Sequence, residues 1–292
     1  MMRVKIKNLM LYDYEESVGF SPHLIRLFPR IDHAITMYGH AVTVNLESDV
    51  QYRRDLYDNL VANCFLPKEG QLLEFIVNLD LEISERNAFH FLLQGNATHL
   101  PIQYSHRERR MLAPFLEVSP EETVDARDLW RPTDGRETVE ALLSLIKALN
   151  KEIQYQVRDE GEAFLPAETL KKRIGACRDI AFLAASMLRQ AGIACRLTGG
   201  FLCAYGASEK NPWSESTLHA WVEVFLSGAG WIGLDPTNGV FCDHHFIPTA
   251  VGIDMADIAP IAGLYFGPVK SRFESELEVK ISGSNEVATA RG

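Results

Sequence analysis

Short alternating runs of apolar and polar residues fill the first third of the chain. Between residue 1 and about residue 113, these runs cover 3–7, 34–38, 41–46, 51–56, 60–66, 72–82 and 88–93. Prolines, glycines and short polar segments such as 67–70 separate them. A period of two that is interrupted by turn residues is typical of antiparallel strands, so the pattern predicts a β sandwich or barrel.

One segment of this region carries ionisable side chains that could be either buried in a site or exposed to solvent. His23, Arg26 and Arg30 lie within residues 21–30 and could line a site. Charged side chains at strand edges are usually solvated, so we expect these three side chains in water.

The pattern changes between residues 101 and 134, where the sequence becomes polar and contains Pro114, Pro120 and Pro132. Such a stretch is typical of a domain boundary. A chain of 292 residues also exceeds the size at which one hydrophobic core usually stops growing. We therefore expect a β-rich N-terminal domain at 1–113, a linker at 114–135 and a second domain at 136–292.

Helical spacing dominates the start of the second domain. A first helix is indicated by Val139, Leu142, Leu143, Ile146, Leu149 and Ile153. A second helix should begin at Pro166 and stop at Gly175. A third keeps Ile180, Ala181, Leu183, Ala184, Met187, Leu188 and Ala191 in phase up to Gly192, which places Cys177 in its first turn. Residues 194–202 read as a strand.

A hairpin follows. Residues 218–226 alternate, with His219 on the less apolar face, and residues 231–235 alternate again up to Asp235. His219 and Asp235 lie directly opposite each other if the pairing is centred on Ser227. A shift of this centre by one residue separates them by two strand positions.

Three residues could form an activated cysteine nucleophile: Cys177, His219 and Asp235. A helix N-terminus favours the thiolate, which is the attacking species. His219 would form an ion pair with it and protonate the leaving group, and Asp235 would orient the imidazole. The backbone N–H of Cys177 is a ready oxyanion donor. Taken singly, each residue has a simpler structural explanation, and the combination of their placements favours the catalytic one.

Other candidates weigh less. Asp179 is expected to cap the cysteine helix. Trp221 and Trp231 could wall a substrate cleft, although large aromatic residues are as often ordinary packing. Residues 242–245, Cys-Asp-His-His, look like metal ligands, but four adjacent residues do not converge on one ion, so we expect no metal site.

Composition narrows the partners and the compartment. The formal net charge of −10 argues against nonspecific nucleic-acid binding, and no apolar stretch is long enough to span a bilayer. The N-terminus lacks the apolar run of a signal peptide. Five scattered cysteines without paired spacing argue against a disulfide framework. We expect a cytoplasmic protein that acts on peptides or proteins, with no membrane partner. The sequence leaves its oligomeric state open.

Three blocks of sequence resemble the bacterial transglutaminase-like superfamily, whose members are often described as candidate cysteine proteases. They are Gly-Ala-Cys-Arg-Asp at 175–179 with the following 188–202, His-Ala-Trp-Val-Glu at 219–223, and Gly-Trp-Ile-Gly-Leu-Asp-Pro-Thr-Asn at 230–238. They occur in the family order, and residues 251–263 look like the segment that follows them. Residues 12–14 and 21–30 are similar to the β-rich N-terminal region that often precedes this core.

The resemblance implies a papain-like, transglutaminase-like α+β core behind the N-terminal antiparallel β domain. It implies Cys177 as nucleophile, His219 as base and acid, Asp235 as orienting carboxylate, and no cofactor. The expected activity is acyl transfer from amide bonds through a thioester, foremost as a peptidase or amide hydrolase. Two alternatives stay open: a protein-glutamine transglutaminase or deamidase, and a non-catalytic interaction module that keeps the fold.

Overall fold

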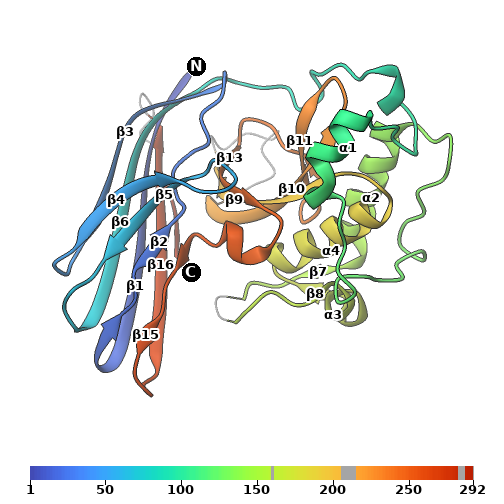
Figure 1. Ribbon diagram of the computed structural model, residues 1–292. Coiled ribbons are helices and arrows are strands. Elements are labelled where there is room, and N and C mark those ends of the chain that lie inside the picture. Colours follow the sequence, from blue (N-terminus) through green and yellow to red (C-terminus); the bar gives the residue numbers. More distant parts are fainter. Residues whose placement is uncertain (159–160, 205–214, 282–286, 292) are drawn as a thin grey trace.

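Both ends of the chain lie in the same antiparallel sheet. The computed structural model describes residues 1–158, 161–204, 215–281 and 287–291. In it, β1 (Met2–Phe20) pairs along one side with β6 (Gly70–Ile83) and along the other with β16 (Ser271–Ile281). β3 (Ile35–Val44) and β17 (Val287–Arg291) complete the sheet, and β15 (Tyr265–Phe266) pairs with the end of β1. Figure 1 shows β16, in red, beside β1, in blue.

A second antiparallel sheet packs against the first. Its order is β14 (Ile261–Ala262), β2 (His23–Ile25), β5 (Leu60–Phe65) and β4 (Asp49–Arg54). Alternate residues of both sheets form one buried core, including Ile6, Met10, Ala62, Cys64, Phe75 and Val77. The predicted antiparallel β region at the N-terminus is therefore confirmed. The strand expected at 88–93 does not form, because Phe91 and Leu93 pack against the hydrophobic core of the second half instead.

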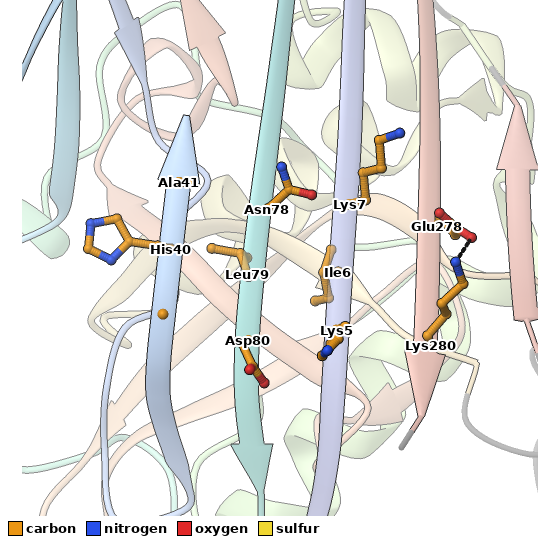
Figure 2. A pocket seen from close by; sticks show the side chains of 11 residues that line it. Lys5, Ile6, Lys7, His40, Ala41, Asn78, Leu79, Asp80, Glu278 and Lys280 are labelled. Carbon is orange, nitrogen blue, oxygen red and sulfur yellow. Dashed lines mark ion pairs between the residues drawn. The ribbon is translucent and has the colours of Figure 1, made fainter. Parts of the chain in front are cut away.

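The outer face of the first sheet is polar. Figure 2 shows this face, with Lys5, Lys7, Asn78, Asp80, Glu278 and Lys280 on three neighbouring strands. A shallow depression of about 430 Å³ lies here, where Gly39 and Ala41 carry little or no side chain.

Residues 271–281 do not follow the expected division of the chain. A catalytic domain at 136–292 would place them in the core, yet they pair with β1 from Val4 to Tyr14, and Leu277 and Val279 are buried in the N-terminal sandwich. The physical reason is that β1 is long and needs a partner on each side, because an uncovered strand edge leaves its backbone groups unpaired.

The second half contains a five-stranded antiparallel sheet and three main helices. The strand order is β12 (Val240–Phe241), β11 (Gly230–Asp235), β10 (Thr217–Leu226), β9 (Cys195–Leu202) and β13 (Phe246–Gly252). The helices are α2 (Thr138–Glu152), α3 (Pro166–Lys172) and α4 (Cys177–Gln190). A short parallel pair joins β7 (Gln154–Tyr155) to β8 (Ile174–Gly175), and 3₁₀ turns cover Gly95–Ala97, Ala113–Phe115 and Met255–Ile258. All three predicted helices are present.

The connecting region also holds a helix that the sequence pattern did not indicate. α1 (His106–Leu112) begins with a capping box between Ser105 and Glu108, a signal that was readable in the sequence. Tyr104, just before it, donates its hydroxyl to the carbonyl of Phe225 at 2.8 Å and so ties this region to the core sheet.

α4 is positioned by small side chains. Ala181, Ala184 and Ala185 are fully buried and let the helix approach the sheet closely. They share a hydrophobic cluster with Ala220 and Val222 on one face of β10. The N-terminus of α4 is thereby held against β10. None of the helices that the structure describes is long and apolar enough to cross a membrane.

The placement of β16 predicts the effect of truncating a side chain. Leu277→Ala should lower the free energy of unfolding by about 2–5 kcal/mol, because it removes a buried side chain from the sandwich. Lys280→Ala, on the exposed face of the same strand, should change it by less than about 0.5 kcal/mol. Chemical denaturation of both variants measures the difference. Equal stabilities would contradict the packing of this strand in the N-terminal core.

Candidate active site

The cysteine helix starts where the sequence pattern placed it. Cys177 is the first residue of α4, and Ala176 before it is extended, with φ −77° and ψ 170°. Asp179 accepts a hydrogen bond from the backbone N–H of Ala176 at 2.8 Å, which confirms its predicted role as a cap. The first N–H groups of a helix have no intrahelical acceptor, so they and the positive end of the helix dipole lie at the Cys177 sulfur.

Asp179 does more than cap the helix. It is fully buried, and its other oxygen accepts from the N–H of Phe164 at 2.8 Å and from Nη2 of Arg158 at 2.9 Å. Arg178 donates to the carbonyl of Arg158. Asp179 and Arg178 therefore fix the segment before α3 against the turn that carries the thiol.

His219 and Asp235 are in contact. Nε2 of His219 lies 3.0 Å from Oδ2 of Asp235, and both residues are buried. Asp235 also accepts hydrogen bonds from the N–H of Thr237 at 2.9 Å and from Nδ2 of Asn238 at 2.6 Å. These hydrogen bonds occupy both carboxylate oxygens of Asp235 and fix the orientation of the group. Sequence reasoning did not single out Asn238, although Asp-Pro-Thr-Asn is a typical side-chain-to-backbone turn.

The predicted register of the hairpin is wrong by one residue. Val222 pairs with Leu234 and Leu226 with Gly230, so the pairing is centred on Gly228. Both glycines have positive φ, +96° at Gly228 and +81° at Gly230, and this three-residue turn sets the register. His219 and Asp235 therefore meet diagonally, which is within reach for long side chains on one face.

The sheet separates next to the thiol. β10 and β11 pair only as far as Val222 and Leu234, although β11 continues to Asp235 and pairs with β12 along its other edge. Both the backbone of Ala220 and the imidazole of His219 interact with the Cys177 sulfur, and each lowers the pKa of Cys177. α4 packs on one face of β10 and His219 lies on the other. The gap between the strands is what allows the two side chains to meet.

The electrostatics favour a thiolate–imidazolium pair. Burial disfavours the Cys177 thiolate, but the hydrogen bonds from His219 and Ala220 and the charge of the imidazolium lower the pKa of Cys177. Burial likewise disfavours a charged His219, but the carboxylate of Asp235 and the Cys177 sulfur raise the pKa of His219. Nε2 of His219 is engaged by Asp235, which leaves Nδ1 as the ring nitrogen available to the sulfur.

Of the two candidate substrate-binding tryptophans, Trp221 lies near the imidazole, whereas Trp231 pairs with Phe225 farther along β10. The ring of Trp221 is almost parallel to that of His219, with centroids 6.2 Å apart, and Trp221 is only 1% exposed. Trp231 is partly buried, with the guanidinium of Arg196 4.2 Å from its ring centroid. Both tryptophans line a cavity of about 520 Å³. Their contact with a substrate stays a prediction.

Residues 243–245 are closer together than the sequence argument allowed. Possible ligand atoms of Asp243, His244 and His245 lie within 4.8 Å of one another. Asp243 accepts from both the backbone N–H and Nδ1 of His245 at 2.9 Å, so one carboxylate oxygen is already used within the turn. Cys242 packs against Gly233 instead, and burial raises its pKa. That the protein needs no metal stays a prediction.

His23, Arg26 and Arg30, which we expected in water, are buried or partly buried. His23 is 5% exposed, and its Nδ1 lies 2.9 Å from the carbonyl of Ser21. Arg26 is partly buried. Arg30 is partly buried too, and it donates to Oδ1 of Asn59 at 2.6 Å. The expectation was wrong because the second sheet and the core cover this segment.

Comparisons with known proteins agree with the architecture. Residues 127–236 match the family model of the transglutaminase-like superfamily, and residues 4–82 match the bacterial transglutaminase-like N-terminal region. A 163-residue stretch is 30% identical to an uncharacterized protein of Mycobacterium tuberculosis, covering 52% of this chain and 51% of that one. A 93-residue stretch is 36% identical to an uncharacterized protein of Mycobacterium leprae, covering 32% and 33%. The chain thus spans about half the length, or less, of these relatives.

A solved structure shares the whole fold. The crystal structure of a candidate cysteine protease from Cytophaga hutchinsonii superposes with a TM-score of 0.71, over 100% of this chain and 98% of that one. The sequence identity is 16%, so the likeness concerns the fold. Together with the family matches, it confirms the predicted fold class and the expected order of a β-rich region and a transglutaminase-like core.

The ion pair predicts selective alkylation of one cysteine. At pH 6, iodoacetamide should modify Cys177 faster than the other thiols, because its lowered pKa gives it a larger thiolate fraction at any given pH. Burial raises the pKa of Cys64 to about 11 and that of Cys195 to about 12, so these thiols should stay unmodified. Peptide mass mapping measures the sites. His219→Ala should abolish the reaction at this pH, and unchanged labelling in that variant would contradict the pairing.

The contacts of Asp179 predict a loss of stability. Asp179→Asn should lower the free energy of unfolding by about 3 kcal/mol, because it leaves Arg158 without its buried carboxylate and turns an amide toward N–H donors. It should also slow the alkylation of Cys177, whose turn Asp179 holds. Asp125→Asn is the matched control, since its ion pair with Arg127 is exposed. Thermal unfolding compares the two, and equal shifts would argue against the structural role of Asp179.

Proposed function

We propose that this chain, which combines a transglutaminase-like core with a bacterial transglutaminase-like N-terminal region, is a peptidase or amide hydrolase that works through a cysteine thioester. The family matches support a cysteine-based enzyme of the transglutaminase-like type. The observation that carries the proposal is the contact of His219 with Asp235 at 3.0 Å, next to a Cys177 thiol whose pKa His219 lowers. In a catalytic triad, the histidine lies between the nucleophile and the orienting carboxylate in the same way.

The first half of the reaction forms the thioester. The Cys177 thiolate attacks the carbonyl carbon of the amide, and the C=O electron pair moves to the oxygen. The N–H of Cys177 at the helix start is a donor for that oxyanion. When the tetrahedral intermediate collapses, the C–N bond breaks and imidazolium His219 gives its proton to the leaving amine. The products are the acyl-enzyme and a free amine.

The second half regenerates the thiolate. Neutral His219 takes a proton from water as the water attacks the thioester, the C–S bond breaks, and the imidazolium–thiolate pair returns. Asp235 stays ionised throughout and holds the imidazole by its Nε2–H, so Nδ1 handles both proton transfers. An amine in place of water would yield a new amide by the same steps. Trp221 beside the imidazole, and Trp231 in the same cavity, would contact the substrate.

A non-catalytic module would have little use for this arrangement. Asp235 is fully buried and His219 nearly so, and burying charged groups is costly unless every partner is in place. Well-packed apolar residues would serve a scaffold at least as well. The arrangement therefore favours catalysis over a purely structural role.

A substrate panel with variants tests the proposal. Cys177→Ala should abolish turnover, and His219→Ala should lower kcat/KM by about 100-fold or more, since general acid–base catalysis contributes at least that much. Cys64→Ser, at a buried thiol in the N-terminal sandwich, is the control and should keep activity. Peptides with and without glutamine are followed for new peptide ends, ammonia release and amine incorporation.

The three readouts separate the possible reactions. New peptide ends that depend on Cys177 support the proposal. Ammonia or amine incorporation without new ends would replace it with deamidation or transglutamination. Turnover that survives Cys177→Ala would refute a thioester mechanism altogether.

A further inference from the structure

The cavity beside the imidazole lies between the two halves of the molecule. Its lining includes Trp221 and Glu223, which lie on the same face of β10 as His219. Arg30 of the N-terminal region and the exposed Glu85 also line it. The cavity has a volume of about 520 Å³. Residues from both halves are required to build it.

Two of the three guanidinium groups in the cavity are neutralised there. Arg196 donates from Nε to Glu223 at 2.7 Å. Arg86 donates from Nη1 to Asp32 at 3.1 Å. Each of these pairs is charge-balanced, so neither needs a further anion.

Arg30 differs from the other two. Its Nη1 donates to the carbonyl of Tyr57 at 3.1 Å and to Oδ1 of Asn59 at 2.6 Å, both neutral acceptors. Among the residues that the structure describes, it makes no carboxylate contact. Burial and the neighbouring Arg196 guanidinium lower the pKa of Arg30, whereas Glu223, Asp58 and Asp55 raise it. Among the described residues that line the cavity, Arg30 is therefore the one arginine that has no direct carboxylate contact.

We propose that this cavity is a specificity subsite that binds an acidic side chain of the peptide substrate, with Arg30 as the charged donor. The proposal rests on the amide-cleaving function proposed above. A carboxylate is the complement of a guanidinium that has no carboxylate contact, because it accepts two parallel N–H donors. Trp221 and Trp231 offer apolar walls for the rest of the residue.

The geometry of β10 gives the distance between the imidazole and the cavity residue Glu223. His219 and Glu223 are four residues apart on β10, which corresponds to about 13 Å along a strand. A substrate that runs extended beside this face advances about 3.3 Å per residue. The acidic residue should therefore lie about three or four positions from the amide that is cleaved.

Binding measured without turnover tests the subsite. Cys177→Ala protein is titrated calorimetrically with N-acetylated, C-amidated hexa-alanine peptides that carry one glutamate at each position in turn. Glutamine versions are the neutral counterparts. We expect the glutamate peptide to bind about tenfold more tightly than its glutamine counterpart at one position or two adjacent positions, as one charge-assisted hydrogen bond provides.

Variants of Arg30 assign the effect. In the same background, Arg30→Gln should remove the preference for glutamate. Arg30→Lys, which keeps the charge without the planar fork, should retain a smaller preference and covers the case in which Arg30→Gln disturbs folding. Lys7→Gln removes one positive charge from the outer face of the N-terminal sheet (Figure 2). Lys7 does not line the cavity, so this variant should leave the preference intact.

The outcomes are separable from those of the proposed function. No preference for glutamate at any position, or a preference that survives Arg30→Gln, overturns the subsite. Acidic peptides that bind through Arg30 but are never cleaved by the wild-type protein would uphold the subsite and refute the peptidase.

Discussion

The separation of β11 from β10 beyond Val222 is the constraint on which the site depends. Within a fully paired sheet, a thiol on one face and an imidazole on the other would be kept apart by the strands. Where the pairing stops, the backbone of Ala220 and the imidazole of His219 both interact with the sulfur. The small side chains of α4 bring its first residue to this gap. The packing of α4 on one face of β10 thereby places the Cys177 thiol next to His219, which lies on the other face.

Two buried carboxylates stabilise the arrangement from opposite sides. Asp179 joins the helix start to the preceding segment, and Asp235 holds the imidazole. Both are fully buried and filled by N–H donors, the condition under which a buried charge is tolerated. Each carboxylate accepts several hydrogen bonds, and these bonds fix the positions of the groups that donate them. The two carboxylates therefore orient the site.

The N-terminal region belongs to the site as much as to the scaffold. It is closed by β16, so the two ends of the chain stabilise one sandwich. Its residues, including Arg30, form a wall of the cavity beside Trp221, and this wall brings a charge to the polar face of β10. The core supplies the reacting groups, and the region in front of it shapes the space next to them.

The sequence by itself determined what depends on neighbours along the chain. It gave the helix that begins at Cys177, the alternation that puts His219 away from the apolar face, and the β character of the N-terminal region, because helix starts and strand periods are local properties. Only the tertiary structure decided the register centred on Gly228, the pairing of β16 with β1 and the burial of Arg30. Each of these depends on contacts between segments far apart in the chain, where turn geometry and the need to cover strand edges outweigh local preference.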